Sequence, residues 1–255
     1  MAERKSLVPG VLEGLDAPGE IRARLSELCE ELSQAAGANL RGLILYGGLA
    51  RGRYRPGKSD INLVVLLDDT STESLSAIAP ALRAAWRAVR VEPFIINASE
   101  AARLAETFPT KLLDIQTHHI VLMGEDPFIG IDVSRKLMCL RIEQSLTNLV
   151  LRLRRRYISI FDDPRSLALA LAEQAVPLKV ELAALLQLAG KDEPSESTSA
   201  AVLESAAAAF ELDREALSLM AALRRDAPTP EDLPALYNRA LATIARAAEI
   251  VSRME

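Results

Sequence analysis

The sequence predicts an α/β (α+β) fold in the first half of the chain, followed by an all-α second half. Short apolar runs of strand length alternate with helical patterns up to Gly124, and no strand-like run occurs from Ser134 onward. The two kinds of element are told apart by the period of their apolar residues and by their length. We therefore expect two domains, residues 1–130 and residues 131–255.

Short apolar runs predict four strands in the first half: residues 41–46, 61–67, 91–96 and 118–123. Helical spacing of apolar residues predicts three helices around them: residues 21–36, 72–90 and 99–105. Pro93 lies inside the third strand and has no N–H to donate. This strand is therefore expected near an edge of the sheet.

The second half is rich in Ala, Leu, Arg and Glu and predicts five helices: residues 135–160, 166–189, 200–210, 214–225 and 230–254. Pro177 is expected to kink or split the second of them, and Thr229 followed by Pro230 suits the start of the last. The polar residues 191–199 predict an exposed loop. The Ala-rich helices could pack against each other or against a second copy, so a homodimer stays open.

Composition argues against several classes of protein. The sequence has no run of about 18 apolar residues and its N-terminus lacks an apolar signal core, so we expect a cytoplasmic protein rather than a membrane or exported one. A net charge of −5 and an aromatic content of only 4% argue against nucleic acid as a partner. Cys29 and Cys139 lie in helical patterns among apolar residues, which favours buried thiols over a disulfide or a metal pair.

One segment carries the chemistry, residues 43–67 with the sequence LILYGGLARGRYRPGKSDINLVVLL. It joins an apolar strand, a Gly-Gly pair, an arginine-containing loop and a Ser-Asp-Ile-Asn sequence that enters a second strand. This order resembles the signature of the DNA polymerase beta superfamily of nucleotidyltransferases, which includes aminoglycoside adenylyltransferases and minimal nucleotidyltransferases. The resemblance implies a mixed sheet flanked by helices, followed by a helical-bundle C-terminal domain.

The residue types in this segment suit phosphate and metal chemistry. Gly47 and Gly48 have no side chains, so backbone N–H groups there could approach a triphosphate. Residues two apart in a strand share a face, so Asp60 and Asn62 should project together. The resemblance implies carboxylates at both positions that bind Mg²⁺, with a third acid on a neighbouring strand.

Asn62 departs from that pattern because an amide replaces the second carboxylate. Its oxygen can still touch a cation, but one negative charge beside the divalent ion is lost. A residual loss of ~3 kcal/mol in the transition state would slow turnover about a hundredfold. We therefore expect Asp60 to be the surviving ligand of a weakened Mg²⁺ site, completed by Asn62 and the third acid.

The third acid is predicted at Glu92, in the third strand. An exposed glutamate at the sheet edge is the alternative, and Asp114 is a weaker candidate for the same role.

Basic residues are concentrated in the loop before Asp60, and arginine and lysine side chains can bind phosphate or an acidic partner. Arg51 is the predicted phosphate contact, whereas Arg53, Arg55 and Lys58 could equally be solvated surface charges.

Histidine contributes little to the predicted site. His118 and His119 are adjacent at the start of a strand, where successive side chains point to opposite faces, so both cannot line one site. A structural or surface role is favoured for each. The arginine-rich residues 152–156 spread over more than one face of a helix, which favours a solvated surface.

Two functions follow from the resemblance. The first is a nucleotidyltransferase-like protein with weakened activity that transfers a nucleoside monophosphate from a nucleoside triphosphate (NTP) to an unknown hydroxyl-bearing acceptor. The acceptor could be a small molecule such as an aminoglycoside, a protein side chain or an RNA end. The alternative is a catalytically inactive pseudo-nucleotidyltransferase that binds nucleotide or serves as a protein-interaction module. Asn62 favours the alternative.

Overall fold

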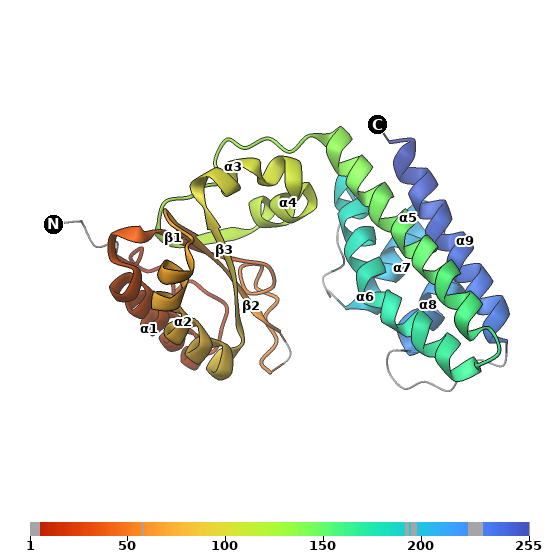
Figure 1. Cartoon of the computed structure of the whole chain (residues 1–255), viewed down its shortest axis with the longest axis horizontal. Coiled ribbons are helices and arrows are strands. Elements are labelled where there is room, and N and C mark those ends of the chain that lie inside the picture. Colours follow the sequence, from red (N-terminus) through yellow and green to blue (C-terminus); the bar gives the residue numbers. More distant parts are fainter. Residues whose placement is uncertain (1–5, 58, 192–193, 195–197, 224–231, 255) are drawn as a thin grey trace. The chain divides into compact units, whose positions relative to one another are not determined.

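The computed structural model describes residues 6–57, 59–191, 194, 198–223 and 232–254 (Figure 1). The chain divides into two compact units, Met1–Val133 and Ser134–Glu255. A four-stranded sheet with helices lies in the first unit, and the described elements of the second unit are helices. The predicted fold class, a mixed sheet flanked by helices and followed by a helical region, is confirmed.

The sheet of the first unit is mixed. Its strands are β1 (Leu40–Tyr46), β2 (Ile61–Leu67), β3 (Val91–Asn97) and β4 (His119–Gly124), in the order β3-β2-β1-β4. β1 is antiparallel to β2 and to β4, whereas β2 and β3 are parallel and need a crossover helix between them. β3 lies at an edge of the sheet, as Pro93 predicted.

Helices cover both faces of this sheet (Figure 1). They are α1 (Gly19–Ala36) and α2 (Thr72–Val89) on one face, and α3 (Ala98–Thr107) and α4 (Pro109–Thr117) on the other. Alternate residues of β2 enter two separate cores, because strand side chains alternate between faces. Leu63 packs in the core with α1 and α2, and Val64 packs in the core with α3 and α4.

The sequence pattern did not predict helix α4. Its buried apolar residues, Leu112 and Ile115, are three residues apart, and the helix begins at Pro109, where a missing N–H costs nothing. From the sequence pattern alone, this segment looks like a loop that leads into the next strand. As a result Asp114 lies on a helix, and β4 begins at His119 rather than at His118.

The described elements of the second unit are α5 (Arg135–Ile160), α6 (Pro164–Leu188), α7 (Ser199–Phe210), α8 (Arg214–Leu223) and α9 (Leu233–Ser252). Pro177 does not split α6, which runs on through it and begins at Pro164 after the cap formed by Asp163. The start predicted at Thr229 and Pro230 lies outside the described residues, as does most of the loop at 191–199. Asp232 caps α9 instead.

Both cysteines are buried as thiols, as the sequence predicted. Burial raises the pKa of Cys29 to about 12. Its thiol is therefore protonated at neutral pH, which makes Cys29 a packing residue rather than a nucleophile. Within the described residues, no helix combines the length and the apolar character needed to cross a membrane.

Glu181 of α6 is largely buried beside Ser145 of α5, and burial raises the pKa of its carboxyl from about 4.5 to about 7, against a smaller lowering by the Ser145 hydrogen bond. Between these two values the folded state binds a proton that the unfolded state has released. The free energy of unfolding should therefore fall as pH rises from about 4.5 to about 7.

The Glu181→Gln variant should lack this loss because its amide does not ionise. We expect the variant to exceed the native protein by about 1 kcal/mol in unfolding free energy at pH 8, after a discount for partial exposure, and to match it more closely at pH 5. Urea unfolding at the two pH values measures the difference. An equal difference at both would show that the ionisation of Glu181 does not affect stability.

Candidate functional site

The predicted residues of β2 and β3 meet at one end of the sheet. Tyr46, the last residue of β1, is the partner of Asn62 in β2, and Asn62 is the partner of Glu92 in β3. Neighbouring strands lie ~4.8 Å apart, so the backbones of Asn62 and Glu92 are adjacent. His119 of β4 also pairs with Tyr46. One row of side chains capable of hydrogen bonding therefore crosses all four strands.

This row lies on the face of the sheet that α3 and α4 cover. Val64 follows Asn62 by two residues and packs in the core of that face, and Phe94 follows Glu92 in the same way. Asn62 is partly exposed and Glu92 is exposed, so the row marks the point where this core ends and solvent begins.

The glycine turn after β1 approaches Asn62 closely. Gly47 has a φ of 74°, and a Cβ added to it would lie 2.6 Å from Asn62 Nδ2. Only glycine combines this left-handed backbone with so short an approach. Gly48 has more room, because a Cβ there would lie 3.9 Å from its nearest neighbour, the Arg53 carbonyl oxygen.

Asp60 already has a cationic partner. The Nε of Arg90 donates to its Oδ1 at 2.6 Å, and the two side chains are 50% and 39% exposed, respectively. Arg90 ends α2 with a left-handed φ of 59° and lies over the Trp86 ring, 5.9 Å from its centroid. An exposed pair of this kind is worth only about 0.2–1 kcal/mol, so a stronger ligand could displace Arg90.

Arg51, the predicted phosphate contact, pairs with Asp114 of α4 through its Nη2 and is nearly buried. This pair links the loop after the glycines to α4. Asp114 therefore holds the Arg51 side chain from helix α4. It does not lie on a strand beside Glu92, as a third acid on the sheet would. Lys58, another cation of the predicted loop, lies outside the described residues.

Lys111 is a residue that sequence reasoning missed. Its Nζ donates to Tyr46 Oη at 2.9 Å and lies 5.0 Å from the centroid of the Tyr46 ring. It also lies 4.7 Å from the centroid of the Phe94 ring. The signal was hidden because Lys111 belongs to α4, which the sequence pattern did not predict.

His119, at the β4 end of the row, makes contacts within the fold. Its Nε2 lies 2.7 Å from Asp126 Oδ2, and its Nδ1 lies 3.1 Å from the Ile115 carbonyl oxygen. Both ring nitrogens are thus engaged within the fold. His118 is exposed at the end of α4, so the two histidines do not share a site.

The donor set is poor for a divalent metal ion. Asp60 and Glu92 bring carboxylates, Asn62 brings an amide, and Asp60 is engaged by Arg90. Within the described ranges, no three His, Cys, Asp or Glu side chains are grouped so that they could hold a metal ion. Hard cations such as Mg²⁺ prefer carboxylate oxygens. These residues therefore do not fit the full Mg²⁺ site that the sequence resemblance implies.

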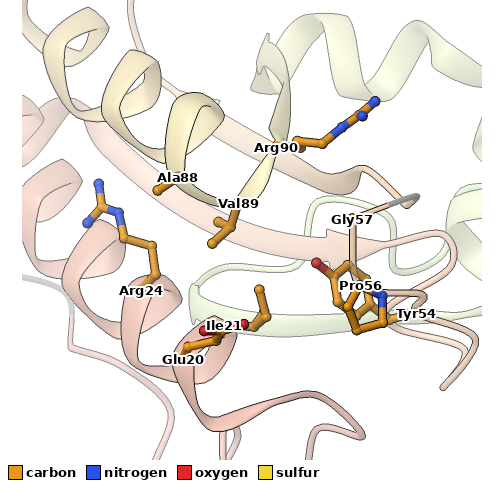
Figure 2. Close-up of a pocket in the computed structure, with 9 residues that line it drawn as sticks. All are labelled: Glu20, Ile21, Arg24, Tyr54, Pro56, Gly57, Ala88, Val89 and Arg90. Atoms are coloured by element: carbon orange, nitrogen blue, oxygen red, sulfur yellow. The ribbon is translucent and has the colours of Figure 1, made fainter.

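A cavity of about 340 Å³ opens elsewhere on the first unit. Figure 2 shows that its lining comes from the start of α1, the end of α2 and the loop between β1 and β2. None of the six predicted site residues lines it. Ile21, Val89 and Tyr54 pack with the core of the α1 and α2 face, so this cavity is separate from the row at Asn62 and Glu92.

Comparisons with known proteins agree with this architecture. A family profile described as a nucleotidyltransferase domain matches residues 25–123, which include all six predicted site residues. Functionally curated sequences give no significant match. Among solved structures, the chain is similar to spectinomycin adenyltransferase AAD(9) from Enterococcus faecialis, determined with ATP and spectinomycin. The TM-score is 0.51 at 15% sequence identity, over 87% of this chain and 98% of that one.

The likeness at this identity concerns the fold, whereas the family match concerns the sequence of the first unit. The family match spans the strand, glycine turn and Asp-x-Asn order at residues 43–67. Residues 25–123 therefore match a nucleotidyltransferase domain, and the fold of the chain is similar to that of spectinomycin adenyltransferase AAD(9).

Proposed function

We propose that the N-terminal unit binds an NTP, with the triphosphate over the end of the sheet where Asn62 and Glu92 lie side by side. We further propose that it transfers the nucleoside monophosphate to a hydroxyl-bearing acceptor slowly. The observation that carries the proposal is the register of β1, β2 and β3, which gathers Tyr46, Asn62 and Glu92 beside the Gly47 turn. The backbone N–H groups of a glycine turn can approach phosphate oxygens closely, and polar side chains at the strand ends can bind them as well.

The transfer exchanges one bond to phosphorus for another. The acceptor oxygen forms a bond to the α-phosphorus as the bond to the bridging oxygen breaks, and pyrophosphate leaves. The acceptor's proton must pass to a base. Glu92 is exposed and hydrogen-bonds to no other described residue, so its carboxylate is available for that proton.

A catalytically inactive, nucleotide-binding protein is the second candidate, and the Arg90–Asp60 ion pair favours it. Asp60, the carboxylate expected to be the main metal ligand, already lies 2.6 Å from the guanidinium of Arg90. Asn62 supplies no second negative charge. Under this alternative, ATP binds and no transfer follows.

The test combines ATP binding with transfer. Isothermal titration of the full chain with ATP, with Mg²⁺ and with EDTA, should detect binding, and labelled ATP should then transfer its AMP group to an acceptor. Spectinomycin is the first acceptor to try because the similar structure contains it with ATP. Aminoglycosides and the protein itself are the next acceptors.

Replacing Glu92 with Gln is expected to leave ATP affinity within about threefold of native and to lower transfer about a hundredfold or more, because a general base contributes that much. Glu106→Gln, at an exposed glutamate on α3, is the matched control and should change neither. Binding of ATP without transfer to any acceptor would establish the inactive alternative. Absence of ATP binding would refute the proposed function altogether.

A further inference from the structure

The ammonium of Lys111 contacts two of the strands that form the predicted site. It contacts Tyr46 of β1 and the ring of Phe94 of β3, and β2 lies between those two strands. Tyr46 is paired with Asn62 and Phe94 with Val64. The two contacts of Nζ therefore flank β2, the strand that carries Asn62, where the resemblance implies a carboxylate.

No anionic partner neutralises this charge among the described residues. The contacts of Lys111 are a neutral hydroxyl and two aromatic rings, and it forms no ion pair within 4.0 Å. The position is also unfavourable for a cation, because Lys111 lies in the first turn of α4, where the helix dipole is positive. The fold thus holds a half-buried positive charge in place with neutral groups alone.

Asn62 adds no negative charge to the strand between these two contacts. An aspartate at position 62 would bring a negative charge that attracts the ammonium, whereas the amide does not. The same substitution that weakens a metal site therefore leaves a protein cation available. A polyphosphate needs positive charge, and either a metal ion or a fixed ammonium can supply it.

We propose that Lys111 is a polyphosphate-binding residue that takes over the electrostatic role of a metal ion, so that this domain binds the triphosphate of an NTP without a divalent cation. The inference rests on the proposed nucleotide-binding function and adds to it the residue and the metal independence. The rings of Tyr46 and Phe94 hold the ammonium in place, and the Gly47 turn follows Tyr46 directly in the chain.

Titration of ATP into the full chain in EDTA and in Mg²⁺ tests the proposal. The native protein should bind ATP in EDTA with an affinity within about tenfold of that in Mg²⁺. Lys111→Met should weaken binding in EDTA about tenfold or more, the effect of losing one charge-assisted hydrogen bond. Lys111→Arg keeps the charge and should bind ATP in EDTA more tightly than Lys111→Met does. Lys136→Met removes an exposed lysine of α5 and should bind as the native chain does.

The outcomes separate this inference from the function on which it rests. If the native chain binds ATP only with Mg²⁺, or if Lys111→Met binds in EDTA as the native chain does, the role of Lys111 is refuted while nucleotide binding stands. If the native chain binds no ATP under either condition, the proposed function fails first. Circular dichroism of each variant checks its fold, and recovery in Lys111→Arg distinguishes loss of charge from loss of structure.

Discussion

The Asn62→Asp variant is expected to transfer AMP from ATP about a hundredfold faster than the native chain in Mg²⁺, the factor that ~3 kcal/mol of restored transition-state stabilisation gives. Position 62 is paired with Glu92 and follows Asp60 by two residues, so the variant brings a third carboxylate to this end of the sheet. Asp60, the new carboxylate at position 62 and Glu92 would then be the residues available to hold one ion. Their attraction for the metal is strong enough to displace the exposed Arg90 from Asp60.

Two measurements check this result. Labelled-ATP transfer gives the rate, and titration with Mn²⁺ monitored by electron paramagnetic resonance gives the metal affinity, which should increase about tenfold or more. Asn62→Ala is the control, because it changes the same position without adding charge and should gain neither property. An aspartate variant with native Mn²⁺ affinity would show that Asn62 is not what limits the metal site.

The same variant should respond differently without metal. Lys111 contacts Tyr46, the strand partner of position 62, so a carboxylate at position 62 would attract the ammonium away from phosphate. ATP binding in EDTA should therefore weaken in Asn62→Asp even as Mg²⁺-dependent transfer increases.

The Gly47→Ala variant is expected to lose about 2–3 kcal/mol of unfolding free energy, through a left-handed backbone and a steric clash. Gly47 has a φ of 74°, and its new Cβ would meet Asn62 Nδ2 at 2.6 Å. The Asn62 side chain must move, and the turn loses its close approach to the site. ATP affinity should fall about tenfold, the effect of ~1.4 kcal/mol of lost binding energy.

Gly130→Ala separates the two causes. Gly130 has a φ of 76°, and a Cβ there would meet nothing within 4 Å. This variant should lose about 1–2 kcal/mol of stability from its backbone alone and keep native ATP affinity. Urea unfolding and isothermal titration measure both quantities for each variant. Equal ATP affinities in the two variants would show that the Gly47 turn does not contact the nucleotide.

Local sequence patterns predicted most elements of the fold. The apolar runs at 41–46 and 61–67 are buried strands within one residue of their predicted ends, and α5 has the predicted bounds. Helix α4 was missed because a nine-residue helix with two buried apolar residues has a weak periodic signal. Pro177 was expected to kink or split α6, and the split does not occur, since packing along a long helix can outweigh the loss of one hydrogen bond.

The sequence alone determined which residue types stand in the segment 43–67 and that Asp60 and Asn62 are two residues apart, because these properties depend on neighbours in the chain. Only the tertiary structure decided that β2 begins after Asp60, that Glu92 lies beside Asn62, that Arg90 holds Asp60, and that Lys111 contacts Tyr46. Those contacts join segments tens of residues apart. Strand register and helix docking bring them together, and both depend on how the two cores of the sheet pack rather than on any local pattern.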